Sequence, residues 1–201
     1  ALYQAVVEAF EGERVRCVIV QALPSPEARL RITLYQGLPK GDKLDWVVQK
    51  CTEAGVARIV PVALRRCVAR PSPQDGEKRR ERWQRIAREA AKQAGRGMVP
   101  PVEAPLSLPQ ALLRLQGHAL VLAPWEEAPS FGPAAVRAAF FQVRDIALVV
   151  GPEGGIHPEE MELLKREAKA LPMTLGPRIL RTETAGLAAA VALMALWGDM
   201  G

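Results

Sequence analysis

The sequence predicts an α/β domain in which a mainly parallel sheet carries helices on both faces, and two observations support this fold class. Short apolar runs such as IALVV (146–150) lack polar alternation, which is typical of strands buried on both faces. Segments with helical periodicity separate these runs, as in strand–helix–strand units. Of the 201 residues, 49% are hydrophobic and 24% charged. No apolar run reaches the roughly 20 residues of a membrane-spanning helix.

The first half of this domain predicts two strands and two helices. The runs RLRITLYQ (29–36) and ARIVPV (57–62) predict strands. Between them, Asp42 is a suitable N-cap and Gly55 a suitable end for a helix whose buried stripe comprises Leu44, Val47, Val48 and Cys51. The next helix has one apolar face with residues spaced three and four apart, namely Trp83, Ile86, Ala87, Ala90, Ala91 and Ala94.

The second half continues the alternation of strands and helices. The same periodicities predict helices at 107–115, 136–141 and 158–170 and strands at 118–123, 145–150 and 172–176. His157 is a suitable N-cap for the helix at 158–170, since Pro158 fits its first turn. A last helix ends near Trp197, and Thr182 or Thr184 is its expected N-cap.

The first 23 residues differ from the rest, because LYQAVVEAF and RVRCVIVQAL predict adjacent strands around EGE with no helix between them. We therefore expect a partial N-terminal β domain at 1–23, a linker at 24–28 and the α/β domain at 29–201.

The 3 cysteines are widely spaced and form no CxxC pair, which argues against a disulfide framework and a zinc site. Unpaired cysteines favour a reducing, cytoplasmic location.

Positive charge is concentrated in one segment. Residues 65–96 hold 11 Arg or Lys against 4 acidic residues, a net charge of +7, whereas the rest of the chain carries −2. Such a local excess suits a polyanion such as RNA, and the apolar face of the helix turns the basic side chains outward. A solvated helix face is the alternative. The residues expected to contact phosphates are Arg65, Arg66, Lys78, Arg79, Arg82 and Arg96.

Three loops follow strand ends at the sheet edge where parallel sheets bind ligands: APWEEAPS (123–130), GPEGG (151–155) and GPRILRTETA (176–185). The last one adds arginines, threonines and a glutamate at the start of a helix rich in small residues. A helix that is simply buried does not explain this cluster of polar side chains at its start.

The GPEGG turn has glycines that allow backbone to approach a ligand closely. Glu153, Glu159 and Glu160 disfavour a phosphate there, and neither GxGxxG nor GxxxxGK[ST] is present. A plain tight turn is the alternative.

At these loops the sequence resembles a known family. LVVGPEGGIHPEE with TLGPRILRTETAGLAA, preceded by GDKLDWVVQKCTEAGVARIVPV and RWQRIAREAAKQAGR, is similar to the bacterial 16S ribosomal RNA uridine N3-methyltransferases, the ribosomal RNA small subunit methyltransferase E family. The resemblance covers about residues 29–201. It implies a SPOUT-type domain with a C-terminal trefoil knot that holds S-adenosylmethionine, a homodimer, and 16S rRNA or the small ribosomal subunit as substrate. It also implies an N-terminal PUA-like β domain, of which residues 1–23 resemble the last strands, and neither a metal nor a membrane partner.

The resemblance and the residue chemistry together suggest roles for the loop residues. The expected cofactor pocket comprises Leu122, Gly151, Glu153, Gly154, Gly155, Leu175, Gly176, Ile179, Leu180, Arg181, Thr184 and Ala185. Uracil N3 is a poor nucleophile until it loses its proton, so we expect Arg181 to stabilise the developing anion and Glu183 or Glu153 to accept the proton. Alternatively, Arg181 merely binds loop carbonyls. Two other functions stay open: a related SPOUT methyltransferase with another RNA target, such as a ribose 2′-hydroxyl, and a non-enzymatic RNA-binding protein.

Overall fold

The computed structural model describes residues 2–68, 71–126 and 131–200, and its main body has the predicted α/β fold. Six strands form one sheet in the order β5-β4-β3-β7-β6-β8, and all neighbouring strands are parallel. Their side chains are buried on both faces at the centre of the sheet, which explains the unbroken apolar runs. The strands are β3 (Arg31–Gly37), β4 (Arg58–Ala63), β5 (Leu106–Ser107), β6 (Leu120–Pro124), β7 (Asp145–Val150) and β8 (Leu171–Met173).

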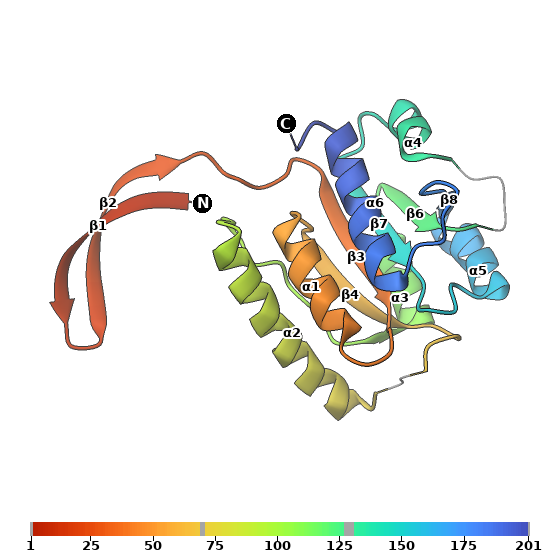
Figure 1. Cartoon of the computed structure of the whole chain (residues 1–201), viewed down its shortest axis with the longest axis horizontal. Coiled ribbons are helices and arrows are strands. Elements are labelled where there is room, and N and C mark those ends of the chain that lie inside the picture. Colours follow the sequence, from red (N-terminus) through yellow and green to blue (C-terminus); the bar gives the residue numbers. More distant parts are fainter. Residues whose placement is uncertain (1, 69–70, 127–130, 201) are drawn as a thin grey trace.

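Helices cover both faces of this sheet (Figure 1). On one face, α1 (Lys43–Glu53) packs against α6 (Thr182–Leu196), and α6 contacts β3 and β7. Outside them, α2 (Pro73–Gln93) packs on α1 and α4 (Pro133–Ala139) packs on α6. On the other face, α3 (Leu108–Leu115) contacts β4 and α5 (Pro158–Ala168). None of the described helices has both the length and the apolar character that crossing a membrane requires.

Three element predictions need correction. Strand β5 was not predicted, because two residues are too few to show a periodicity. The helix expected at 136–141 is α4, which begins earlier because Pro133 suits a first helical turn. Ala94 was expected on the buried face of α2, but it is exposed at the C-cap position after the last helical turn.

Two predicted helix caps also differ from the structure. Asp42 occupies the N-cap position of α1, as predicted, but its side chain makes no capping hydrogen bond; its carboxylate lies 3.3 Å from Nη2 of Arg82 instead. The N-cap of α6 is Arg181 rather than Thr182 or Thr184. The hydroxyl of Thr182 is committed to tertiary hydrogen bonds instead, which local sequence rules do not foresee.

An antiparallel hairpin of β1 (Leu2–Glu11) and β2 (Arg14–Leu23) extends away from the α/β body (Figure 1). Its apolar side chains are exposed, including Phe10 at 77%, so the hairpin contributes nothing to the core. At its base the chain is anchored to the body. The Glu27 carboxylate accepts hydrogen bonds from Arg96 Nη2 at 2.6 Å and from the backbone N–H of Gly97 at 2.9 Å.

Candidate functional site

A cavity of about 540 Å³ lies at the carboxyl ends of β6, β7 and β8, a size typical of small-molecule sites. Most of its wall comes from residues 124–126 at the end of β6, 150–156 at the end of β7, and residues between 173 and 185, from the end of β8 to the start of α6. The helices that follow β3 and β7 lie on opposite faces of the sheet, since α1 packs with α6 and α5 packs with α3. A crevice opens between strands at such a point, and open α/β sheets bind their ligands there.

The GPEGG turn after β7 is packed too closely for a larger residue at its first position. A Cβ atom at Gly151 would lie 2.6 Å from the carbonyl carbon of Gly155 and from the nitrogen of Ile156. Gly155 has a φ of +71°, in the left-handed region that favours glycine. Beyond the turn, His157 caps α5 as predicted, because its Nδ1 accepts a hydrogen bond from the Glu159 N–H at 3.3 Å. The turn therefore brings backbone atoms to the cavity wall.

A buried polar network ties this turn to β3 and α6. The fully buried Gln36 on β3 donates from Nε2 to Oγ1 of Thr182 at 2.9 Å. The same Thr182 hydroxyl donates to the carbonyl of Gly151 at 2.6 Å. Because a buried polar group is costly unless it is hydrogen-bonded, these bonds fix the start of α6 against the GPEGG turn.

Lys43, the first residue of α1, joins two carboxylates of the cavity. Its Nζ lies 2.9 Å from Oε1 of Glu153 and 3.6 Å from Oε2 of Glu183. Oε1 of Glu153 also accepts a hydrogen bond from the Lys40 N–H at 3.0 Å. Nothing in the local sequence distinguishes Lys43 from other lysines, and sequence reasoning missed it.

These contacts keep Glu153 and Lys43 charged. Burial by itself raises the pKa of Glu153, but hydrogen bonds from Lys43 and from backbone N–H groups, with the charge of Lys43, outweigh it and lower that pKa. In turn, the hydrogen bond to Glu153 and the nearby negative charges raise the pKa of Lys43 against a smaller effect of burial. The lowered pKa makes Glu153 a weaker base than an ordinary carboxylate.

Arg66, expected to contact phosphates, lines the cavity and holds the GPEGG turn. Its Nη1 donates to the carbonyl of Gly154 at 2.6 Å and to that of Ile156 at 3.3 Å. A Cβ atom at Gly154 would lie 3.3 Å from Cβ and Cδ of Arg66. A side chain at Gly154 would therefore meet the arginine stem.

Most residues of the expected cofactor pocket line this cavity, namely Gly151, Glu153, Gly154, Gly155, Leu175, Gly176, Ile179, Leu180, Arg181 and Ala185. Leu122 does not, because it is fully buried in the core of β6; Pro124 and Trp125 further along line the wall. Thr184 is exposed outside the cavity. Residues 127–130 of the APWEEAPS loop lie outside the described residues.

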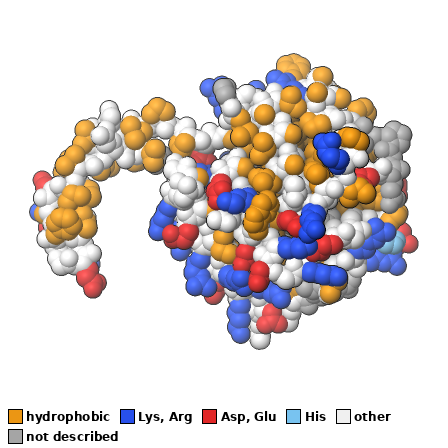
Figure 2. Space-filling view, viewed as in Figure 1, with side chains coloured by type: hydrophobic (Ala, Val, Ile, Leu, Met, Phe, Trp, Pro, Cys, Tyr) orange, Lys and Arg blue, Asp and Glu red, His pale blue; other side chains and the backbone are white. Residues whose placement is uncertain are grey.

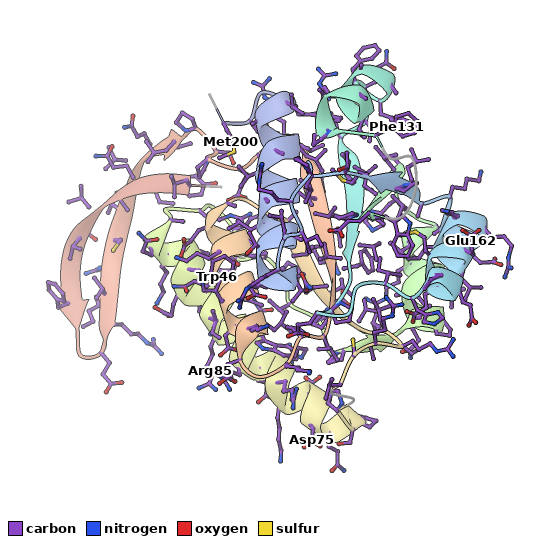
Figure 3. All side chains as sticks on the ribbon, turned by 45° about the vertical axis from the view of Figure 1, so that its right-hand side comes forward. Trp46, Asp75, Arg85, Phe131, Glu162 and Met200 are labelled. Carbon is purple, nitrogen blue, oxygen red and sulfur yellow. The ribbon has the colours of Figure 1, made fainter. Side chains whose placement is uncertain are left out.

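The expected RNA-binding residues of α2 lie on its outer side. Lys78 and Arg79 are exposed and make no ion pair within the part of the chain that the structure describes. Arg85 extends from the same helix into solvent (Figure 3). Figure 2 shows Lys and Arg side chains along this side, interspersed with acidic ones. Arg82 is exposed but pairs with Asp45.

The two remaining predicted contacts lie beyond the ends of α2. Arg65 is exposed and pairs with Glu159 at 2.5 Å. The prediction that Arg96 contacts RNA phosphates is wrong, because its side chain is only 5% exposed. Its Nη1 donates to the carbonyls of Thr52 and Val56 at 3.0 and 2.9 Å, and Nη2 binds the Glu27 carboxylate. A guanidinium with these partners cannot reach a phosphate, so Arg96 has a structural role.

The chain matches the model of the RNA methyltransferase domain over residues 26–194. It is 35% identical over 192 residues to the ribosomal RNA small subunit methyltransferase E of Bacillus subtilis, which covers 93% of this chain and 75% of that protein. The chain belongs to the ribosomal RNA small subunit methyltransferase E family. Its relative from Mycobacterium bovis is 36% identical over 199 residues, with 97% of this chain and 73% of that protein covered.

A solved structure of the same family allows a direct comparison. The ribosomal RNA small subunit methyltransferase E of Neisseria gonorrhoeae, bound to S-adenosyl methionine, is 35% identical with a TM-score of 0.80, and the match covers 99% of this chain and 80% of that one. The match to the RNA methyltransferase domain model, over residues 26–194, includes all four segments on which the sequence resemblance rests, so the predicted family is confirmed. No group of three or more possible metal ligands occurs among the residues that the structure describes.

Proposed function

We propose that this chain transfers the methyl group of S-adenosylmethionine to N3 of a uridine in 16S ribosomal RNA. The observation that carries the proposal is the cavity at the strand ends. The GPEGG turn and the 173–185 segment form its wall, in a chain 35% identical to a family member solved with that cofactor bound. Backbone at Gly151, with Leu175, Gly176, Ile179 and Leu180, is proposed to surround the adenine and ribose.

The transfer requires a deprotonated nitrogen beside the methyl group. N3 attacks the methyl carbon, the carbon–sulfur bond breaks, and its electron pair stays on the sulfur. The N3 proton leaves to a base, for which Glu183 and Glu153 are the candidates, and Arg181 stabilises the developing anion. Arg181 is exposed at the cavity wall, which supports this role. Because N3 lies on the Watson–Crick edge, the uridine must be unpaired or flipped out.

The RNA is proposed to contact the exposed basic side of α2 through Lys78 and Arg79. We divide the chain into a partial PUA-like β domain at 1–23, a linker at 24–28 and a SPOUT-type domain at 29–201. We further propose that the protein is cytoplasmic. A trefoil knot is supported by the return of the chain from β8 at the sheet edge to α6, which packs against central strands.

A homodimer is proposed to bury the outer side of α6 and the residues after it. Leu196 and Met200 there are 39% and 54% exposed. Light scattering coupled to size-exclusion chromatography would give a mass twice that of the 21.9 kDa chain.

Mass spectrometry of nucleosides tests the reaction. The protein is incubated with S-adenosylmethionine labelled in the methyl group and with either 16S rRNA or small ribosomal subunits, and the digested RNA is analysed. We expect labelled 3-methyluridine. A labelled 2′-O-methyl nucleoside would instead indicate the related methyltransferase, and RNA binding without transfer would indicate a non-enzymatic RNA-binding protein.

A further inference from the structure

Lys43, Glu153 and Glu183 form a charge cluster at the cavity that joins three elements: the start of α1, the GPEGG turn and the first turn of α6. Oε1 of Glu153 and Oε2 of Glu183 lie 2.9 and 3.6 Å from the ammonium nitrogen of Lys43, so these two oxygens are no more than 6.5 Å apart. Two ionised carboxylates this close would repel each other, and the ammonium group that joins them offsets that repulsion.

The two carboxylates are held differently. Oε1 of Glu153 accepts two hydrogen bonds, one from the Lys43 ammonium group and one from the Lys40 N–H. Oε2 of Glu183 is buried and has no hydrogen-bond partner among the residues that the structure describes, since 3.6 Å to Nζ of Lys43 is too long for one. A carboxylate oxygen without a donor keeps its capacity to accept a proton.

We propose that Lys43 is a positioning residue of the methyl transfer: it holds Glu153 in a structural ion pair and positions the Glu183 carboxylate to accept the proton that uridine N3 loses. This inference rests on the proposed function and decides between its two candidate bases. The proton moves from N3 to the Glu183 carboxylate as the nitrogen–carbon bond forms, and it then passes to solvent. Lys43 touches neither reacting atom and acts through the two glutamates.

Other charged groups face the cluster from the remaining walls of the cavity. They are Arg66 after β4, Glu126 after β6, and Arg178 and Arg181 before α6. Within the described ranges, Lys43 supplies the ion pair of Glu183. Replacing Lys43 by an uncharged residue would remove the hydrogen bond and the charge that lower the pKa of Glu153, and would leave two neighbouring carboxylates without the cation that joins them.

The first experiment compares pH profiles of single-turnover methyl transfer to rRNA between about pH 6 and pH 9 for the wild type, Lys43→Met and Lys43→Arg. We expect Lys43→Met to lose at least about tenfold in rate at the acidic end and to recover most of it at the alkaline end. Lys43→Arg keeps the charge and should restore the wild-type profile. Lys50→Met on the same helix is the matched control, because Lys50 is equally exposed at 35% but pairs with Glu53 away from the cavity.

Calorimetry with S-adenosylmethionine accompanies each profile. A rate loss in Lys43→Met that is equal at every pH, or that follows a loss of cofactor binding, would overturn the role of Lys43. Absence of transfer by the wild type would overturn the proposed function itself, which is a different result.

The second experiment compares Glu183→Gln with Glu153→Gln. We expect Glu183→Gln to lose at least about 100-fold in transfer rate with cofactor affinity retained, the usual effect of removing a general base. Glu153→Gln keeps the hydrogen-bond acceptor and should lose less than about tenfold. The reverse order of the two losses would overturn the assignment of Glu183.

Discussion

Replacing Arg96 by methionine should destabilise the fold without weakening RNA binding. The guanidinium is 5% exposed, binds Glu27 at 2.6 Å and donates to two backbone carbonyls. Removing one partner of a buried pair typically costs about 3 to 5 kcal/mol. Glu27 would keep bonds from the Gly97 and Met98 N–H groups, so we expect a loss just below that range, about 2 to 3 kcal/mol. For a chain of this size that corresponds to a fall in Tm of roughly 5 to 10 °C.

Urea unfolding followed by circular dichroism measures this loss as a change in transition midpoint at constant slope. The matched control is Lys92→Met near the end of α2, because the Lys92 side chain is 67% exposed and pairs with Glu89 in the preceding turn. That change should cost less than about 0.5 kcal/mol. If Arg96→Met cost less than about 1 kcal/mol and also weakened RNA binding, the structural role of Arg96 would be refuted.

Four further outcomes are expected. Replacing Lys78 and Arg79 by alanine should lower the slope of log K against log salt for RNA by about 1.4 to 1.8, measured by fluorescence anisotropy; an unchanged slope would mean a merely solvated face. Gly151→Ala places a Cβ 2.6 Å from backbone of Gly155, so calorimetry should show at least about a tenfold loss of cofactor affinity, and unchanged affinity would contradict the close packing. The lowered pKa of Glu153 contributes stability above its ordinary pKa that is lost as pH falls, so the urea midpoints of wild type and Glu153→Gln should converge in acid; a constant gap would contradict this. Chelation of divalent metals should leave methyl transfer unchanged, and its loss would reveal a required metal.

The features that sequence could predict are those that depend on neighbours in the chain. The parallel sheet followed from apolar runs, and the N-cap at His157 followed from the proline after it. The glycine turn after β7 was predicted because tight backbone packing excludes side chains there.

The features that sequence reasoning missed depend on contacts between distant segments. Arg96 carries the same charge as Lys78, but only tertiary structure reveals that Glu27 buries it. Thr182 suits an N-cap by its residue type, yet its hydroxyl bonds to Gln36, 146 residues earlier. Lys43 reaches the site only because the fold brings the start of α1 beside the GPEGG turn, and the local sequence does not show this.

The network of Gln36, Thr182 and Gly151 has a consequence for how the protein is made. Its members come from the first strand of the sheet, the turn after β7 and the last helix. A nascent chain lacking α6 has no Thr182 to close the cavity, so this wall forms only after nearly all of the chain has been synthesised. Contacts between such distant segments form late and slowly in folding. Capture of S-adenosylmethionine would then report that the last helix has docked, and the cofactor could not guide the earlier steps of folding.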